Sequence, residues 1–156
     1  MSGAAISQLE SLYRQRYEHF VRVATAFLRN EERAVDVVHD AFAIAIASRR
    51  TYRGEGSLEA WVWRIVVNGA LKALAVRPGT ASVELSTFDD RADRQPVRDA
   101  ILGLPERQRL ALFLRYYADL DYRSIATALE ISPGTVAATL NAAHASLRRT
   151  LEEVRS

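Results

Sequence analysis

The chain has 156 residues, of which 49% are hydrophobic, so it can form one ordinary domain or two small ones with a real core. It contains no cysteine, which excludes disulfide scaffolds, thiolate metal sites and cysteine nucleophiles. The net charge of +2, with Lys72 as the only lysine, gives weak support for nucleic-acid binding.

Helical periodicity dominates the first part of the chain. An apolar stripe marks a first predicted helix, formed by Tyr13, Tyr17, Phe20, Ala24, Phe27 and Leu28. After Asn30, a second stripe is formed by Val35, Val38, Phe42, Ala45 and Ile46. This second helix is expected to end near Arg49 and Arg50, because positive charge suits a helix C-terminus. No alternating strand pattern competes, so we expect an all-α protein.

A third helix is predicted after a loop at residues 52–56. Ser57 is its expected N-cap, Glu59 lies in its first turn, and it runs to about Val76 before Pro78 and Gly79 end it. Residues 80–95 have little periodicity and hold several acids, which predicts an extended, mobile linker. The sequence thus predicts two small helical domains, a first module at 1–77 and a second at 96–156, joined by a flexible linker at 78–95.

The second module carries a helix-turn-helix pattern. Its first apolar stripe is formed by Leu110, Phe113, Leu114 and Tyr117. Asp121 is placed to cap a short helix, and after a turn at Glu130, Ser132 is placed to cap a final helix with Pro133 at its first position. Two helices joined by so short a turn form a helix-turn-helix. From spacing alone, DNA binding and an ordinary helical bundle are equal alternatives.

Specific residues favour DNA binding. In the second module they are LPERQR at 104–109, LRY at 114–116, DY at 121–122, IA at 125–126 and ISPGTV at 131–136. In the first module they are LY at 12–13, DVVHDAF at 36–42, YRG at 52–54, WVWRI at 61–65 and the asparagine at 68. The chain therefore resembles an extracytoplasmic-function (group IV) sigma factor of the sigma-70 family, with regions 2 and 4 in the family's order. The resemblance implies a transcription initiation factor that brings core RNA polymerase to specific promoters and assists strand opening.

Polymerase binding is the role that the resemblance gives to the second helix. The residues implied are Asp36, His39, Asp40 and Phe42. The first three lie off the apolar stripe and so form a polar, partly acidic patch suited to a basic partner. For an isolated pair of acids, a solvated helix face would be the alternative. The resemblance also implies an anti-sigma factor as a partner, whose binding would pack the modules together and hide both the patch and the DNA face.

Contacts to the minus-ten element are implied for the loop and the third helix. The residues are Tyr52, Arg53, Trp63, Arg64 and Asn68. Trp61 and Trp63 point about 200° apart on a helix, so we expect one in the core and one partly exposed. An exposed ring can stack on an unpaired base, and we assign this role to Trp63. The alternative is that both rings pack against neighbouring helices.

Contacts to the minus-thirty-five element are implied for the second module. The residues are Arg115, Arg123, Thr135, Ala138, Asn141, Arg148 and Arg149. The final helix departs from the family because it carries few basic residues before Arg148, and Glu130 stands where glycine is common. Val67 likewise stands where an arginine is common. The final helix offers Ala138, Asn141, Ala142 and Ala145 to the groove, and among these four only Asn141 can make a bidentate base contact. We therefore expect promoter choice to depend more on the minus-ten contacts.

Other function classes stay open. A sigma-like interaction protein would bind polymerase or an anti-sigma factor without reading DNA, and a helix-turn-helix repressor would explain only the second module. His19, His39 and His144 are widely separated in the sequence, and no nucleophile, base and orienting group occur together. We therefore expect no metal, no cofactor and no enzymatic activity. Residues 1–9 lack the charged and apolar regions of a signal peptide, and polar residues interrupt the apolar stretch at 61–76, so we expect a cytoplasmic protein without membrane insertion.

Overall fold

A computed structural model of the chain describes residues 3–54, 56–76 and 95–155. Within these ranges the protein is built from α-helices, a short 3-10 turn and a π-helical segment, with no strand, which confirms the predicted all-α class. The predicted linker at 78–95 lies outside the described residues except for its last position. No helix in the described ranges combines the length and the apolar character needed to cross a membrane.

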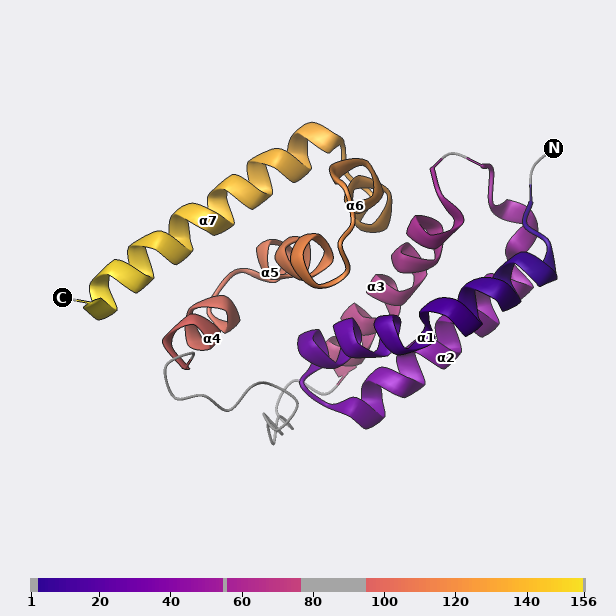
Figure 1. Ribbon diagram of the computed structural model, residues 1–156, viewed down its shortest axis with the longest axis horizontal. Coiled ribbons are helices and arrows are strands. Elements are labelled where there is room, and N and C mark those ends of the chain that lie inside the picture. Colours follow the sequence, from indigo (N-terminus) through magenta and orange to yellow (C-terminus); the bar gives the residue numbers. More distant parts are fainter. Residues whose placement is uncertain (1–2, 55, 77–94, 156) are drawn as a thin grey trace.

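The first module consists of three helices and a short turn. They are α1 (Ile6–Leu28), α2 (Glu31–Ala47), a 3-10 turn (Arg49–Thr51) and α3 (Leu58–Val76) (Figure 1). Asn30 caps α2 by accepting a hydrogen bond from the backbone N–H of Arg33 at 2.9 Å. Ser57 caps α3 as predicted, since its Oγ accepts the backbone N–H of Ala60 at 3.0 Å. The three helices pack side by side, and their shared core includes Phe20, which is fully buried.

The second module contains four helices and the π-helical segment. They are α4 (Gln95–Leu102), α5 (Glu106–Leu112), the π-helical segment (Phe113–Tyr117), α6 (Tyr122–Leu129) and α7 (Pro133–Arg155). The long helix α7 packs across α4, α5 and α6 (Figure 1). Its buried side is formed by Val136, Leu140 and Ala143, whose spacing is that of one face of a helix.

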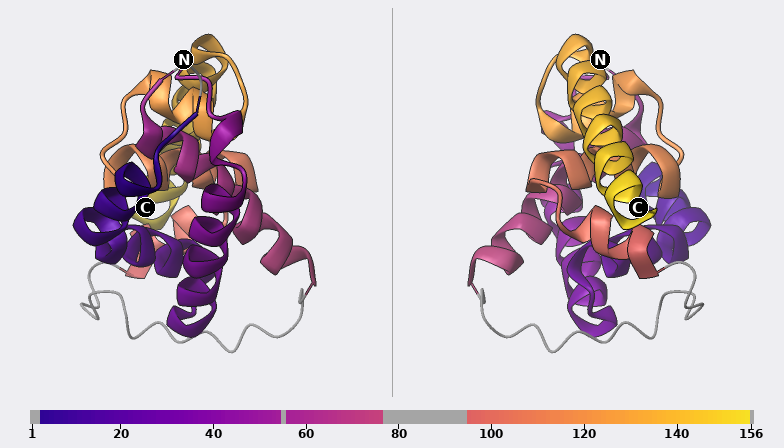
Figure 2. Two further views of the ribbon diagram at one scale, coloured as in Figure 1. Left: turned by 90° about the vertical axis from the view of Figure 1, so that its right-hand side faces the viewer. Right: turned by 90° about the vertical axis from the view of Figure 1, so that its left-hand side faces the viewer.

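The two modules lie against each other (Figure 2). They share one continuous hydrophobic core. Phe27 at the end of α1 meets Phe113 edge to face, with ring centroids 6.0 Å apart. Nearby, His19 Nε2 lies 3.1 Å from the carbonyl oxygen of Ala118. A second contact joins α3 to α6. The chain's own residues therefore pack the modules together, whereas we expected this packing with an anti-sigma factor bound.

Candidate functional site

The predicted polymerase patch lies on the solvent side of α2. Asp36, His39 and Asp40 are all exposed, while Val38 and Ala45 on the inner side of the helix are fully buried. Because Asp36 and Asp40 are four residues apart, their carboxylates lie one above the other on the same helix face. The structure thus brings two carboxylates and an imidazole together on one open surface, an arrangement that fits a basic partner.

Two tyrosines of α1 extend this patch, although the sequence pattern places them only in the apolar stripe. The ring of Tyr17 stacks on His39, with centroids 5.5 Å apart and planes 16° apart, and Tyr13 Oη lies 3.4 Å from His39 Nε2. Burial, followed by the charges of Tyr13 and Glu31, raises the pKa of Tyr17, so its phenol is neutral at physiological pH. The residue type could have indicated this position, because a tyrosine ring has a polar tip and often lies at the edge of a core.

Phe42 lies beneath the patch and not on it. Its side chain is 5% exposed and packs edge to face on both Tyr13 and Phe20, at 5.1 and 5.5 Å between ring centroids. We expected Phe42 to contact polymerase, but in this structure its ring is buried and cannot make a direct contact. The physical reason is its place on the apolar stripe of α2, which commits the ring to the core. Phe42 supports Tyr13 from below and so helps to position the patch.

The described residues of the loop predicted to meet the minus-ten strand make specific contacts. Tyr52 Oη donates a hydrogen bond to the carbonyl oxygen of Gly56 at 2.7 Å, and its ring lies 5.5 Å from that of Trp61. Gly54 and Gly56 have φ angles of 79° and 80°, a region that glycine adopts without strain. The loop leaves Arg53 exposed and Tyr52 half-buried. Arg53 is therefore the side chain of this loop best placed to meet a strand.

Both tryptophans of α3 are buried, so the expectation of an exposed Trp63 is wrong. Trp61 is 7% exposed and Trp63 only 1%. The ring of Trp63 lies 4.3 Å from that of Phe20, and its Nε1 donates a hydrogen bond to Glu59 Oε2 at 3.2 Å. The expectation assumed that α3 has one covered side, whereas α3 packs against α1 and α2 and also against α6. Trp63 is a core residue in this arrangement and cannot stack on a base.

The remaining minus-ten candidates on α3 reach the surface. Arg64 and Asn68 are both exposed and lie one helical turn apart. Arg64 also forms an ion pair with the second module, because its Nε lies 3.7 Å from Glu130 Oε1. Arg53, Arg64 and Asn68 are therefore accessible candidates for contact with the minus-ten strand, and the buried Trp63 is not.

The helix-turn-helix has the two caps that its sequence predicts. Asp121 Oδ1 accepts the backbone N–H of Ser124 at 2.8 Å, and Ser132 Oγ accepts the backbone N–H of Thr135 at 3.1 Å. Between the helices, Glu130 adopts the left-handed conformation with φ of 59°. A side chain is strained there and glycine is not, which gives a physical reason why glycine is common at this position in the family.

The minus-thirty-five candidates on α7 fall into two groups. Thr135, Ala138 and Asn141 are exposed along its first turns, on the face opposite the core. Arg148 and Arg149 are also exposed, but at 1.5 Å per residue they lie between about 10 Å (from Asn141) and about 20 Å (from Thr135) further along the axis. Only the first group could enter a groove together, and it carries no charge. The positive charge of this helix face therefore lies at Arg148 and Arg149, apart from the first group.

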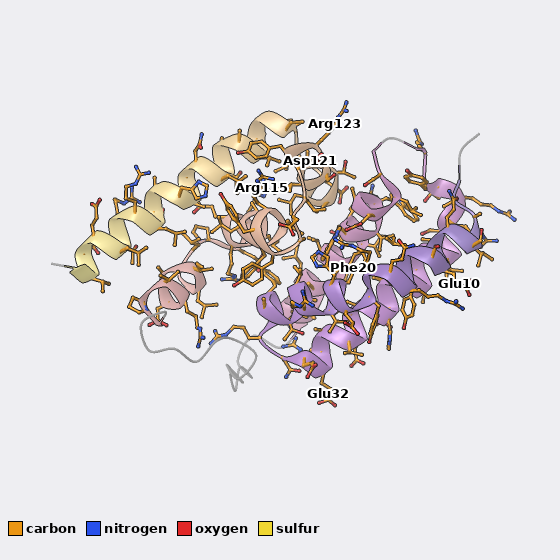
Figure 3. The ribbon with its side chains drawn as sticks, in the orientation of Figure 1. Glu10, Phe20, Glu32, Arg115, Asp121 and Arg123 are labelled. Carbon is orange, nitrogen blue, oxygen red and sulfur yellow. The ribbon has the colours of Figure 1, made fainter. Side chains whose placement is uncertain are left out.

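The other two arginine candidates differ in how freely they can reach DNA (Figure 3). Arg115 is half-buried, donates a hydrogen bond to the carbonyl oxygen of Leu120 at 3.1 Å and lies 5.5 Å from the ring centroid of Tyr122. Arg123 is exposed on α6. Arg115 therefore stabilises the start of α6 through these contacts. Arg123 is the more accessible of the two side chains.

Replacing Asp121 with alanine should lower the free energy of unfolding by about 1 kcal/mol, the usual effect of losing an N-cap. Hydrogen bonds from the backbone and side chain of Ser124 hold the pKa of Asp121 below its ordinary value. A lowered folded-state pKa means that the stabilisation is present above the unfolded pKa of about 3.9 and is lost as the pH falls through the folded pKa. Urea unfolding of the wild type and Asp121→Ala at neutral and acid pH measures this, with Asp121→Asn as the control that keeps an acceptor. A difference of equal size at both pH values would contradict it.

The histidines each make a protein contact. Besides the contacts of His19 and His39, His144 Nε2 lies 3.0 Å from Tyr116 Oη. In the part of the chain that the structure describes, no three histidine, cysteine, aspartate or glutamate side chains are grouped closely enough to hold a metal ion.

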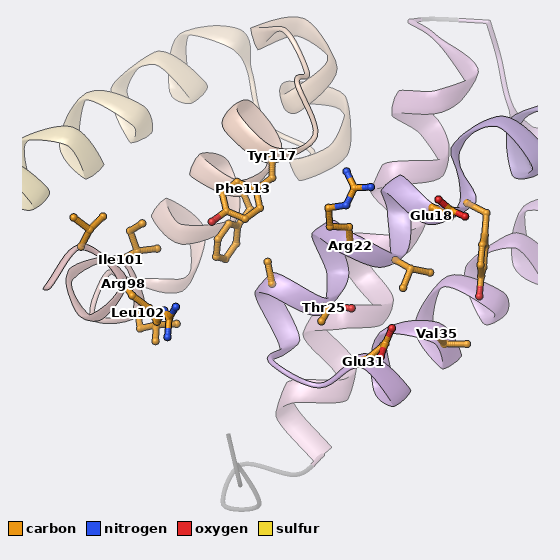
Figure 4. Close-up of a pocket in the computed structure, with 14 residues that line it drawn as sticks. Glu18, Arg22, Thr25, Glu31, Val35, Arg98, Ile101, Leu102, Phe113 and Tyr117 are labelled. Atoms are coloured by element: carbon orange, nitrogen blue, oxygen red, sulfur yellow. The ribbon is translucent and has the colours of Figure 1, made fainter. Parts of the chain in front are cut away.

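A cavity of about 780 Å³ lies between the modules (Figure 4). Its walls come from α1 and α2 on one side and from α4 and the π-helical segment on the other. The lining is mostly apolar, including Val21, Ile101 and Phe113, and it carries charged groups at Arg22 and Glu31.

Comparison with known proteins identifies both modules. The model of Sigma-70 region 2 matches residues 12–77, and the model of Sigma-70, region 4 matches residues 94–147. A curated relative, the ECF RNA polymerase sigma-E factor of Escherichia coli (strain K12), is 30% identical over 78% of this chain and 75% of its own length.

Solved structures share the fold across both modules. CnrH in complex with the cytosolic domain of CnrY has a TM-score of 0.73 and 19% identity, covering 96% of this chain and 91% of that chain. The sigma factor RpoE in complex with the anti-sigma factor NepR from Bartonella quintana has a TM-score of 0.66 and 19% identity, covering 92% and 98%. With both regions present in order, and a sigma-E relative at 30% identity over most of its length, this protein belongs to the extracytoplasmic-function sigma factors of the sigma-70 family.

Proposed function

We propose that this protein is a transcription initiation factor, which binds core RNA polymerase, directs it to specific promoters and assists strand opening. The observation that carries this function is the presence of regions 2 and 4 together in one chain. A protein that only bound polymerase or an anti-sigma factor would need neither the folded loop with Arg53 nor a capped helix-turn-helix. A repressor would leave the first module unexplained.

Each module has its own share of this function. We assign core polymerase binding and the minus-ten element to residues 1–77, the minus-thirty-five element to 96–156, and the connection to 78–95. Polymerase meets Asp36, His39 and Asp40, the minus-ten strand meets Arg53, Arg64 and Asn68, and promoter duplex meets the first turns of α7. The protein acts in the cytoplasm and is not an enzyme, because recruitment and strand binding need no chemical step. An anti-sigma factor is a further partner, as in the complex of RpoE with NepR.

The two modules should contribute unequally to promoter choice. The outward face of α7 offers Ala138, Asn141, Ala142 and Ala145, which are all exposed. Alanine can touch a thymine methyl group but donates no hydrogen bond, so Asn141 alone can make a bidentate base contact, worth about 1–3 kcal/mol. The first module instead presents Arg53, Arg64 and Asn68 to an unpaired strand.

Transcription by purified core polymerase on a genomic DNA library, with and without this protein, tests the function. We expect discrete transcripts only in its presence. Aligned upstream of their start sites, the recovered promoters should share a strong minus-ten sequence and a weaker minus-thirty-five sequence. Absence of protein-dependent transcripts would refute the function, and a stronger minus-thirty-five sequence would refute only the ranking of the modules.

A further inference from the structure

The segment that precedes α1 is bonded to the turn that leads into the loop with Arg53. The backbone N–H of Gly3 donates a hydrogen bond to the carbonyl oxygen of Tyr52 at 2.6 Å (Figure 1). The backbone N–H of Ala4 donates to the carbonyl oxygen of Arg49 at 2.9 Å. These positions lie far apart in the sequence, so the pairing is a tertiary contact between two ends of the first module.

Glycine at position 3 allows the two backbones to approach each other in this way. Gly3 has a φ of 108°, a conformation that residues with a side chain rarely adopt. A β-carbon built on Gly3 would lie 3.5 Å from Arg50 Cα, so the segment runs directly against the turn. Ala4, the next residue, is only 8% exposed. The pairing therefore depends on the backbone freedom of Gly3.

The first turn of α1 holds this segment from the other side. Gln8 Oε1 accepts a hydrogen bond from the backbone N–H of Ala5 at 2.7 Å. Ala5 is the N-cap residue of α1 and has no side-chain oxygen of its own, so Gln8 supplies the link between the segment and the helix. Residues 3–5 thus form a bridge from α1 to the turn at residues 49–52.

The bridge fixes the peptide unit that leads into Arg53. A peptide bond is planar, so the carbonyl group of Tyr52 and the N–H group of Arg53 lie in one plane. The hydrogen bond from Gly3 to that carbonyl sets the orientation of the plane. Beyond Arg53, the chain is held again where Tyr52 Oη donates a hydrogen bond to the carbonyl oxygen of Gly56. The backbone around Arg53 is therefore fixed on both sides, while its side chain is exposed.

We infer that residues 3–5 position Arg53 for its contact with the minus-ten strand, with Gly3 as the main positioning residue. The inference rests on the proposed function, which assigns Arg53 to that strand. A side chain on a loop that is already ordered loses less conformational freedom on binding than one on a free loop. Release of the bridge should therefore slow strand opening. Polymerase binding should be unchanged, because Asp36 and Asp40 lie on the solvent side of α2 and make no use of the bridge.

Gly3→Val tests the inference, because a β-branched residue is strongly disfavoured at this φ angle. On a promoter recovered from the genomic library, the variant should form open complexes about fivefold more slowly, the factor that corresponds to one typical hydrogen bond. Its affinity for core polymerase should equal that of the wild type. In the Arg53→Ala background, which lacks the side chain that is positioned, Gly3→Val should cause no further loss.

Gln8 provides a second and milder test. Gln8→Ala removes the acceptor that holds Ala5, so it should also slow opening, but by less than Gly3→Val does. Gln8→Glu keeps an oxygen acceptor in the first turn of a helix, where a carboxylate is favourable, and should open as the wild type does. The control is Ser7→Ala, at the neighbouring exposed polar position, which should also open at the wild-type rate.

Amide hydrogen exchange in the free protein tests the bridge without DNA. In Gly3→Val the backbone amides of Thr51 and Tyr52 should exchange faster, whereas those in the middle of α3 should be unchanged. Unchanged exchange at the turn, opening at the wild-type rate, or an equal further loss in the Arg53→Ala background would each overturn the inference. If Arg53→Ala itself opened as the wild type does, both the inference and the assignment of Arg53 would be wrong. Wild-type protein without promoter-specific transcription would refute the proposed function, and the exchange would still show whether residues 3–5 hold the turn.

Discussion

Replacing Trp63 with alanine should lower the free energy of unfolding by about 3–5 kcal/mol, the range for truncating a large buried aromatic side chain. Trp63 is 1% exposed, and the ring sits against Phe20, which is itself fully buried. Truncation also leaves Glu59 without the Nε1 donor that bonds it at 3.2 Å, although Arg16 Nη2 still reaches Glu59 at 3.3 Å. The loss is therefore mainly one of packing, with a smaller polar contribution.

Urea unfolding followed by circular dichroism measures this loss. Trp63→Phe keeps much of the ring and loses only the N–H group, so its effect should be much smaller. The neighbouring Arg64→Ala, at an exposed position, should change stability by no more than about 0.5 kcal/mol. If Trp63→Ala were as stable as the wild type and failed only in promoter opening, the ring would be a base-stacking residue after all.

Local features of the fold could be predicted from the sequence because they depend on neighbours along the chain. Ser57, Asp121 and Ser132 cap their helices as expected, since a cap needs only a short polar side chain and the backbone N–H groups that follow it. The stripe of α7, with Val136 and Leu140 inward, follows from helical periodicity in the same way.

The burial of side chains on a helix that is covered on more than one side could not be predicted from the sequence. Periodicity reports which face of a helix is apolar, and for α3 that face includes residues packed on α1, α2 and α6 at once. Two tryptophans on different sides can then both be buried, as Trp61 and Trp63 are. For Phe42 the periodicity was the better guide. It placed the ring on the apolar stripe of α2, in the core, whereas the resemblance assigned the ring a contact with a partner.

The ion pair between modules shows why single positions can mislead. From the sequence, Glu130 is only a departure from the glycine common at the turn, and Arg64 is only a minus-ten candidate. Their separation of 66 positions gives no local signal, so the pairing becomes visible only when α6 lies on α3. In the sequence Glu130 only replaces a turn glycine, whereas in the structure it takes part in a contact between the modules.

Reversing two charges on α2, with Asp36→Arg and Asp40→Arg, should weaken binding to core polymerase by at least about tenfold, or about 1.4 kcal/mol. The carboxylates are exposed and lie on one helix face, so they meet a partner together. A basic surface that gains free energy from two negative charges would be repelled by two positive ones, and more strongly at low salt, where screening is weak. The fold should be unaffected, because arginine has higher helix propensity than aspartate and neither side chain is buried.

Fluorescence titration of labelled protein with core polymerase at two salt concentrations measures the affinity. The matched control is Glu152→Arg with Glu153→Arg, which makes the same change in net charge at exposed positions near the end of α7. If affinity depends on the patch, the control should bind nearly as the wild type does, whereas the α2 variant should not. Circular dichroism should give the same helical signal for all three proteins. Equal loss in both variants would point to net charge alone, and unchanged binding of the α2 variant would remove Asp36 and Asp40 from the polymerase contact.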